Sequence, residues 1–267
     1  MRKISPVSDR NFHMTYNTSH KDMTFNFHAH DHYEVYYFCS GQIQYYIEDQ
    51  SYNMVAGDVL VIPPGRMHRV VTVDEAVPYS RIVMDLSEAY CKRLMARVSD
   101  HFVFRGVPTY LFASPDGNRE ILERMLSFLD MEAGEAGVLE RDATVTLLLL
   151  ELDRCFKNAP TAVGEEHSLA QVIRYIDANF TRSITLEEMA ERFFISKYHL
   201  LRRFKKLTNS TVHQYILTKR ILLARALLRQ GMNPADVATE CGFQTYSGFY
   251  QAFLSQTGQK PSSFQKE

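Results

Sequence analysis

The sequence lacks three features that would place the chain in a membrane or in an oxidising compartment. Its four cysteines are widely separated in 267 residues and form no CxxC pair, which favours reduced thiols over a disulfide framework. It has no run of 18 apolar residues, so no membrane-spanning helix is expected. Its first residues carry charge but no apolar core of the kind that secretory signals have. We therefore expect a cytoplasmic protein, and the length suits two domains better than one.

Positive charge is scarce in the first part of the chain and concentrated in the last hundred residues. The whole chain has 30 Lys and Arg against 31 Asp and Glu, a net charge of −1. Residues 168–267 hold 14 basic and 7 acidic side chains, a net of +7, and the remainder holds 16 and 24, a net of −8. A basic segment of this kind suits a polyanionic partner, although an ordinary solvated surface has the same composition.

The last hundred residues contain the same helical pattern twice. In each copy a short helix with a small residue, Ala190 or Ala238, precedes a tight turn and a polar residue fit to cap a second helix. The second helix of each copy carries apolar residues four positions apart, on one helical face. These residues are Leu200 and Phe204 after Ser196, and Phe249 and Phe253 after Thr245. This is the helix-turn-helix pattern, whose second helix enters the DNA major groove.

A long helix is expected between the two copies. Ser168, Thr185, Thr211 and Asn233 each stand where a side chain can cap a helix, and such signals predict about seven helices in residues 168–267. The connecting helix is expected at residues 212–229, and its length is roughly 27 Å at 1.5 Å per residue. With the width of the units at its ends, it can set two recognition helices about 34 Å apart, one turn of B-DNA.

The first part of the chain reads as many short strands separated by turns. Residues 35–39, 43–47, 59–62, 69–73 and 80–84 are rich in β-branched and aromatic side chains. Turn sequences separate them, among them Ser40-Gly41, Ala56-Gly57-Asp58 and Pro63-Pro64-Gly65. Short strands at such close spacing predict an antiparallel sandwich or a small barrel.

Two segments of this region resemble the motifs of the cupins. The first is His28-Ala-His30-Asp-His32-Tyr-Glu34 with Gly41 after it, and the second is Gly57 with Pro63-Pro64-Gly65 and His68 after it. Cupins fold as jelly-roll barrels, and these positions often hold a divalent metal. The resemblance implies a cupin-like barrel whose candidate ligands for Zn, Mn, Fe or Ni are His28, His30, Glu34 and His68. On a strand, His28, His30 and Glu34 would face one side.

The same residues have a second interpretation. Thr72 stands where cupin enzymes usually have Asn, and regulators built on this barrel often keep similar histidines without metal. A small barrel can hold one ligand, so His28, His30, Glu34, Tyr36 and His68 also form a candidate effector site. Tyr36 either packs against the ligand or belongs to the core. On this interpretation no cofactor is required.

Two antiparallel helices are expected after the barrel. Residues 119–131 and 139–157 each carry an apolar stripe, and Gly134 and Gly137 lie between them. One face can cover the barrel, and a surplus stripe around Leu148 and Leu152 can meet a second protomer; alternatively the whole pair is internal core. The predicted organisation is a barrel at 1–115, a helical hairpin for dimerisation at 116–158, a linker at 159–167 and a DNA-binding domain at 168–267.

Residues 184–264 closely resemble the DNA-binding domain of the AraC/XylS (arabinose-regulator) family. The matching landmarks are Leu186, Ala190, Ser196, Leu200, Arg202, Phe204, Lys205, Arg220, Ala224, Leu227, Leu228, Val237, Ala238, Gly242, Phe243, Ser247, Phe249, Phe253, Gly258 and Pro261. The resemblance implies an α+β multidomain transcription regulator, an activator in our interpretation and not an enzyme. Its barrel would bind an effector, for which a sugar is the family's commonest association, and form a homodimer. Its all-α domain would bind double-stranded DNA and act on RNA polymerase.

The resemblance also assigns roles within the first recognition helix. Tyr198, Leu201 and Arg202 correspond to residues that face bases, and they lie off the apolar face of the helix. Arg can pair with guanine through two hydrogen bonds, and Leu201 can touch a thymine methyl group. Contacts to phosphate, which carry no sequence information, are expected from Lys197, Lys205 and Lys206, although these lysines also suit a plain charged surface.

The second recognition helix departs from the family pattern. Gln251 stands where the family commonly has Arg, Leu254 where it has Lys, and Gly248 costs about 1 kcal/mol relative to Ala within a helix. We therefore expect weaker DNA contact from this helix. Its candidate DNA-binding residues are Tyr246, Ser247, Tyr250 and Gln251, of which Gln251 can pair with adenine.

Two other classes of protein remain open from the sequence. A cupin metalloenzyme, an isomerase or dioxygenase with a helical appendage, would contain stoichiometric Fe or Mn and turn over a substrate. A helical module that docks another protein would show no retention on DNA. Phosphate-driven binding, by contrast, appears at low salt and falls steeply as salt rises.

Overall fold

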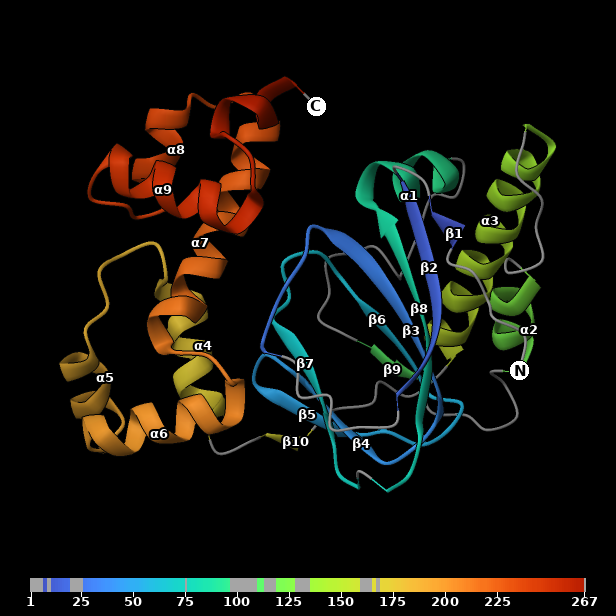
Figure 1. Cartoon of the computed structure of the whole chain (residues 1–267), viewed down its shortest axis with the longest axis horizontal. Coiled ribbons are helices and arrows are strands. Elements are labelled where there is room, and N and C mark those ends of the chain that lie inside the picture. The colour runs from blue at the N-terminus through green and yellow to red at the C-terminus, as the bar shows by residue number, and fades with distance from the viewer. Residues whose placement is uncertain are drawn as a thin grey trace.

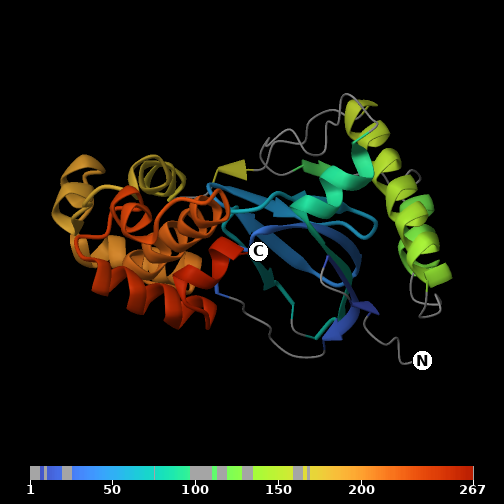
Figure 2. The ribbon, with the colours of Figure 1, turned by 90° about the horizontal axis from the view of Figure 1, so that it is seen from above.

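A β-rich N-terminal domain and a helical C-terminal domain lie side by side in the computed structural model (Figure 1). The structure describes residues 7–8, 11–19, 26–74, 76–96, 110–112, 119–127, 135–158, 165–166 and 169–266. The views in Figures 1 and 2 place α3 on the side of the β-rich domain that is remote from the C-terminal domain.

The N-terminal domain is built from two antiparallel sheets. One sheet has the strand order β1 (Val7–Ser8), β2 (Phe12–Ser19), β8 (Tyr79–Ser87), β3 (His32–Ser40), β6 (Val59–Ile62) and β9 (Tyr110–Phe112). The other has the order β10 (Glu165–Glu166), β5 (Gln50–Asn53), β4 (Ile43–Ile47) and β7 (His68–Thr72). This arrangement confirms the β-rich fold, although the described strands do not close into a continuous barrel.

Strand β3 shows why both faces of the larger sheet are apolar. Tyr36 and Phe38 belong to the cluster between the two sheets, whereas Val35 and Tyr37 belong to a second cluster on the outer face. Side chains alternate along a strand, so a strand buried on both faces reads as a continuous apolar run. The segment His28–His30, expected on a strand, instead forms one isolated bridge, His28 to His68, and a bend at Asp31 separates it from β3.

Three helices cover the outer face of the larger sheet: α1 (Glu88–Met95), α2 (Arg119–Ser127) and α3 (Glu135–Asn158). Helix α3 is continuous through Gly137, which was expected to interrupt it. Leu148 and Leu152 are fully buried in this chain, so the stripe around them is core and is not available to a second protomer. Among the side chains of α3 that the structure describes, the large apolar ones that are exposed are Val138, Leu139, Leu147 and Leu150.

The C-terminal domain consists of two helical units joined by α7 (Val212–Arg229), whose bounds agree with the expected connecting helix. The first unit comprises α4 (Ala170–Asn179), α5 (Leu186–Arg192) and α6 (Lys197–Thr208). The second comprises α8 (Pro234–Glu240), α9 (Tyr246–Thr257) and the 3-10 helix η2 (Pro261–Lys266). In Figure 1 the two units lie at opposite ends of α7.

The predicted helix caps can be compared with the hydrogen bonds at each helix start. Thr185 and Asn233 cap α5 and α8, and Thr211 with Gln214 forms a complete capping box at α7. Helix α4 differs, because it begins after Leu169 without a side-chain cap, and Ser168 lies outside the described residues.

The two domains share a hydrophobic cluster. Phe27 and Met67 of the N-terminal domain pack with Leu169 and Ile173 of the first unit and with Tyr215 of α7. The backbone N–H of Phe27 donates to the carbonyl of Thr208 at 2.9 Å. Within the expected linker, β10 adds to the edge of β5, so this part of the linker is a strand. The C-terminal domain is therefore docked on the β-rich domain.

Two expectations from composition can be compared with the structure. All four cysteines are free thiols. Among the helices of the described ranges, none is long and apolar enough to cross a bilayer.

Candidate DNA interface and effector site

The first recognition helix, α6, presents the predicted base-contacting residues to solvent. It begins at Ser196, whose hydroxyl accepts a hydrogen bond from the backbone N–H of His199 at 3.3 Å. Leu200 and Phe204 are fully buried and fix the rotation of the helix. Tyr198, Leu201 and Arg202 are exposed on the opposite side, and Tyr198 keeps 69% of its surface accessible.

The second recognition helix, α9, has the same design. Its cap Thr245 accepts from the N–H of Gly248 at 3.1 Å, and Phe249 and Phe253 are buried. Tyr246, Ser247 and Gln251 are exposed, whereas Tyr250 is half-buried against Tyr246. Tyr250 is thus less accessible to DNA than the other candidates.

The three lysines expected at phosphates differ in their surroundings. Lys197 pairs with Glu187, and the Nζ of Lys205 donates to the carbonyl of Asn209 at 3.0 Å. Lys206 is exposed on the same helix. Contact with phosphate would require Lys197 to leave a carboxylate partner, which reduces the gain from that contact.

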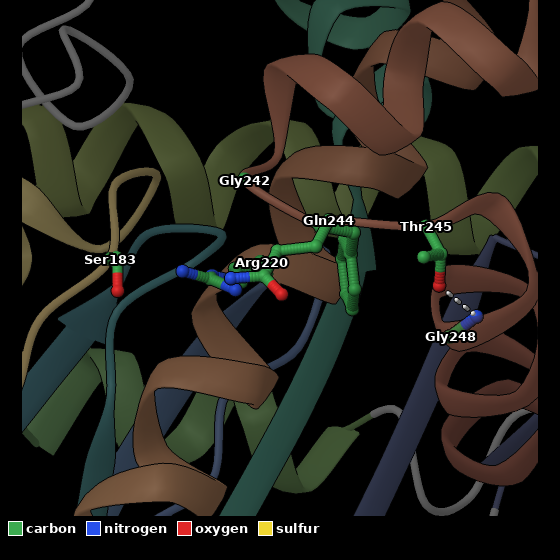
Figure 3. Close-up of a pocket in the computed structure, with 7 residues that line it drawn as sticks. Ser183, Arg220, Gly242, Gln244, Thr245 and Gly248 are labelled. Carbon is green, nitrogen blue, oxygen red and sulfur yellow. Dashed lines mark hydrogen bonds between the residues drawn. The ribbon is translucent and has the colours of Figure 1, made fainter.

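The turn between α8 and α9 of the second unit contacts the loop between α4 and α5 of the first unit. Figure 3 shows Arg220 of α7 in a hollow of 460 Å³ beside this turn. Its guanidinium group donates to the carbonyls of Phe180 at 2.7 Å and Arg182 at 2.9 Å. Gly242, with φ of +81°, packs directly on the backbone of Thr181. Because its hydrogen bonds join α7 to the α4–α5 loop, we assign Arg220 a structural role.

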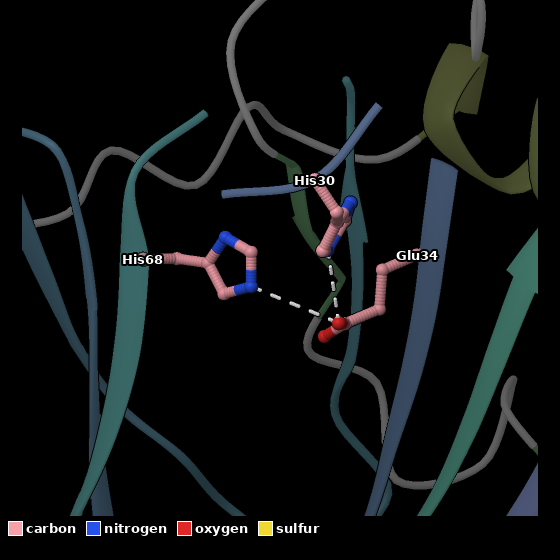
Figure 4. A group of neighbouring side chains, drawn as sticks. All are labelled: His30, Glu34 and His68. Atoms are coloured by element: carbon pink, nitrogen blue, oxygen red, sulfur yellow. Dashed lines mark hydrogen bonds and ion pairs between the residues drawn. The ribbon is translucent and has the colours of Figure 1, made fainter. Parts of the chain in front are cut away.

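The predicted effector residues of the N-terminal domain come together at the edge that faces the DNA-binding domain. His30, Glu34 and His68 place one ligand atom each within 4.8 Å of one another, and we call these three residues the histidine group (Figure 4). His30 Nε2 lies 3.2 Å from Glu34 Oε2, and His68 Nε2 lies 3.7 Å from the same oxygen. The His28 ring packs on His68 at 4.3 Å but is not one of the three.

Backbone carbonyls orient the imidazole rings. The Nδ1 atoms of His30 and His68 donate to the carbonyls of His32 at 2.9 Å and Arg66 at 2.8 Å, and that of His28 donates to Asn26 at 3.0 Å. A carbonyl only accepts, so each Nδ1 carries the proton and each neutral ring has its lone pair on Nε2. The Nε2 of His68 is buried and has no hydrogen-bond partner among the described residues. The histidine group thus presents lone pairs and a carboxylate to one point.

Burial and the nearby charges set the protonation of these groups. Burial lowers the pKa of His28 to about 4, aided by His68, and burial also lowers the pKa of His30. Burial alone would raise the pKa of Glu34, but its interactions with the nearby His30 and His68 rings hold it well below its usual value. Around neutral pH the group therefore combines the Glu34 carboxylate with the neutral ring of His30, donors that suit a cation.

A small hollow of 140 Å³ adjoins the histidine group. It is lined by His28, Glu34, Tyr36, Tyr45, Val70, Tyr79, Arg81 and Val83. The structure places Tyr36 there, as expected, with its hydroxyl bonded to that of Tyr79. Tyr45, Tyr79 and Arg81 were not predicted. The hydroxyl of Tyr45, which lies in the opposite sheet, donates to Glu34 at 3.1 Å. Side chains along β4 alternate between buried and half-buried positions, and this alternation in the sequence could have placed Tyr45 inside and Tyr46 outside.

Comparison with known proteins identifies the family of this chain. Residues 15–172 match the model of the AraC-like ligand binding domain, and residues 189–267 match that of a helix-turn-helix domain. The chain belongs to the AraC family of transcription regulators. It is a DNA-binding regulator with a ligand-binding domain, which confirms the fold class and the general function expected from the sequence.

Several proteins are similar to this AraC-family chain over most of its length. A Bacillus subtilis protein described as an uncharacterized HTH-type transcriptional regulator, YbfI, is 27% identical over 231 residues, 82% of this chain and 79% of the relative. The melibiose operon regulatory protein of Escherichia coli K12 is 22% identical over 253 residues, with coverage of 90% and 83%. The crystal structure of ToxT from Vibrio cholerae O395 aligns with 13% identity and a TM-score of 0.43, covering 97% and 98% of the two chains.

Proposed function

We propose that this AraC-family regulator responds to a small polar molecule, a sugar in the first instance, bound in the hollow of its N-terminal domain. The hollow carries the proposal, because Glu34, Tyr36, Tyr45, Tyr79 and Arg81 offer hydrogen-bonding groups around an apolar wall. A volume of 140 Å³ is below the roughly 300–1,000 Å³ of pockets for drug-sized ligands, so the ligand is small. The similarity to the melibiose operon regulatory protein, which is named for a sugar operon, supports a sugar as the ligand.

Calorimetric titration with a panel of monosaccharides tests the ligand class. Tyr45→Phe removes the hydroxyl that donates to Glu34, and we expect it to weaken binding at least tenfold, since a buried acceptor is left unpaired. Tyr46→Phe is the matched control on the other face of β4, and it should leave affinity unchanged. Equal losses in both variants, or no binding of any sugar, would contradict the proposal.

We assign the DNA contacts to the exposed faces of α6 and α9. Tyr198, Leu201 and Arg202 read bases in one groove segment, and Lys197, Lys205 and Lys206 contact phosphate beside it. Tyr246, Ser247 and Gln251 contact the next segment, with Tyr250 at its edge. Exposure around buried anchors supports both assignments. Binding of the full chain to duplex DNA, measured by fluorescence anisotropy at increasing salt, must weaken steeply if phosphate contacts dominate.

A divalent transition metal is a second candidate ligand, and the unpartnered Nε2 of His68 favours it. His30, Glu34 and His68 would hold the ion, and the backbone carbonyls at each Nδ1 supply the outer hydrogen bonds that metal-bound histidines usually have. His28, predicted as a fourth ligand, lies next to the group. Cobalt absorption spectra of the full chain test this proposal. His68→Ala must abolish the visible bands and His199→Ala must retain them, whereas bands in both or in neither would refute the assignment.

The dimer, the polymerase contact and the cell compartment are further proposals. Exposed Leu139, Leu147 and Leu150 on α3 support a homodimer through that face, and light scattering of Leu147→Glu should show the monomer where the wild type is a dimer. As an activator the protein would contact RNA polymerase in the cytoplasm. The barrel would bind its ligand without converting it, as the regulatory roles of the relatives suggest. Conversion of a bound sugar by the purified chain would contradict this.

A further inference from the structure

One carboxylate joins the N-terminal domain to the far end of α7. Asp31 lies between His30 and His32, and its Oδ2 accepts from Arg225 at 2.7 Å and also pairs with Arg229. Its Oδ1 lies 3.7 Å from Nδ1 of His32. The two arginines occupy the last two turns of α7, next to the second unit. All of these side chains are at least partly shielded from solvent, which strengthens the ion pairs relative to exposed ones.

Aromatic packing continues from these arginines to the second recognition helix. The guanidinium carbons of Arg225 and Arg229 lie 5.3 and 5.7 Å from the ring centre of Phe264. Phe264 is buried and meets the ring of Phe253 edge-on at 5.2 Å. Phe253 is one of the two anchors that set the rotation of α9. Arginine packs favourably on aromatic faces, so the ion pairs of Asp31 are connected through Phe264 to the core of the second unit.

The same segment forms one side of the histidine group. The rings of His30 and His32 stack at 3.8 Å with planes 9° apart, and Nδ1 of His30 donates to the carbonyl of His32. A bound group that draws Nε2 of His30 toward Glu34 therefore acts on His32 and on the intervening Asp31. Such an effect requires that the ligand bind one position of this segment more tightly than another.

The other described ion pairs between the domains are arranged differently. Asp49 pairs with Arg174 of α4 at 2.6 Å, and Glu48 pairs with Lys219 in the first half of α7 at 3.2 Å. Both involve the turn between β4 and β5. Neither carboxylate contacts a member of the histidine group, although Glu48 accepts from Arg66, whose carbonyl orients His68. They hold the first unit, whereas Asp31 reaches the helix end that carries the second.

We propose that Asp31 is a positioning residue that transmits occupancy of the histidine group to the second recognition helix. The proposal rests on the effector role assigned to that group. It predicts that the two domains are coupled at a defined place, and that the second unit responds to the ligand more strongly than the first.

Hydrogen–deuterium exchange of the full chain tests the mechanical connection. Asp31→Asn should raise amide exchange in the second half of α7 and in α8 and α9 by roughly tenfold, the effect of losing a charge-assisted hydrogen bond. Asp49→Asn is the matched control, and its effect should be confined to the first unit. Asp31→Glu should restore most of the protection. Unchanged exchange of the second unit in Asp31→Asn would overturn the proposal.

A second comparison tests transmission from the histidine group. His68→Ala and Glu34→Gln alter the group without touching α7, and either should change exchange in α8 and α9. The change should disappear when Asp31→Asn is already present, which a purely structural role of Asp31 would not produce. Persistence of the full change in that background, or no change from either substitution in a folded chain, rejects the proposal. DNA binding by the wild type is measured separately, so loss of the regulatory function and loss of the coupling are distinguishable.

Discussion

A β-carbon added to Gly242 would lie 1.9 Å from the carbonyl oxygen of Thr181, closer than any side chain tolerates. Gly242 belongs to the turn of the second unit, and Thr181 belongs to the loop that follows α4 in the first. The two units are thus fixed to each other by backbone contact in addition to α7.

Gly242→Ala should destabilise the DNA-binding domain strongly. The substitution combines a left-handed backbone, φ of +81°, with a steric overlap, and we expect a loss of roughly 2–4 kcal/mol in the free energy of unfolding. Urea denaturation followed by circular dichroism measures it. Gly231→Ala is the control, because its φ is +87° with no atom within 4 Å, and it should lose only about 1 kcal/mol. Similar losses at both positions would contradict the close-contact argument.

Phe194→Gly should leave stability unchanged or raise it by up to about 1 kcal/mol. Phe194 takes the left-handed conformation in the turn of the first unit, φ of +50°, and is 98% exposed, so it gains no packing for the strain. Glycine relieves the strain at some cost in chain entropy. Thermal melts of this variant and of Phe193→Gly, which removes a side chain packed on the core, make the comparison. A clear loss of stability in Phe194→Gly would refute our interpretation.

Arg202→Ala should cost more DNA affinity than Gln251→Ala. An arginine that reads guanine through two hydrogen bonds contributes about 1–3 kcal/mol, and α9 lacks such a residue. Footprinting titrations with both variants on one DNA fragment measure the difference. Both side chains are exposed, so neither substitution should alter folding. A larger loss from Gln251→Ala would reverse the assigned order of the two helices.

Asp142→Asn should weaken the attachment of α3 to α1 in a pH-dependent manner. Asp142 accepts from Tyr90 at 2.6 Å and from Arg93 at 3.0 Å. Burial is the largest single effect and opposes ionisation, but the hydrogen bonds from Tyr90 and Arg93 and the nearby arginine charges together lower the pKa of Asp142. A lowered pKa stabilises the fold above the unfolded value of about 3.9, and the contribution is lost as pH falls through the folded pKa. The variant should therefore be less stable at pH 7, by about 1 kcal/mol, and approach the wild type in acid. A deficit independent of pH would contradict this.

Local patterns predicted much of the secondary structure. The bounds of α7 and the strands β4 and β6 follow from caps, turns and apolar runs that lie within a few residues of each element. The helix-turn-helix units follow from apolar anchors such as Leu200 and Phe249. The residues of the histidine group were predicted from the resemblance of two separate segments to the cupin motifs, which also included His28, a residue that lies beside the group.

Contacts between distant segments were not predictable in the same way. The hollow needs Tyr45 and Tyr79 from different sheets to face Tyr36, and a single sequence does not show which strands meet. The sequence does not show that Leu147 is exposed and Leu148 is buried. Both positions are Leu, so the apolar pattern does not fix the rotation of α3 about its axis. The pairing of β10 with β5 is made by backbone hydrogen bonds, which any residue type can form, so the amino-acid composition of residues 165–166 does not indicate it.

The ion pairs between the domains change what the basic C-terminal segment offers to DNA. Arg174, Lys219, Arg225 and Arg229 already face carboxylates of the N-terminal domain, so their charge is largely neutralised within the molecule. These four residues will therefore release few of the counterions condensed on DNA when the protein binds. The steepness of the salt titration should accordingly report the outward-facing side chains of α6 and α9, and an excess of seven positive charges overstates the field that a duplex meets.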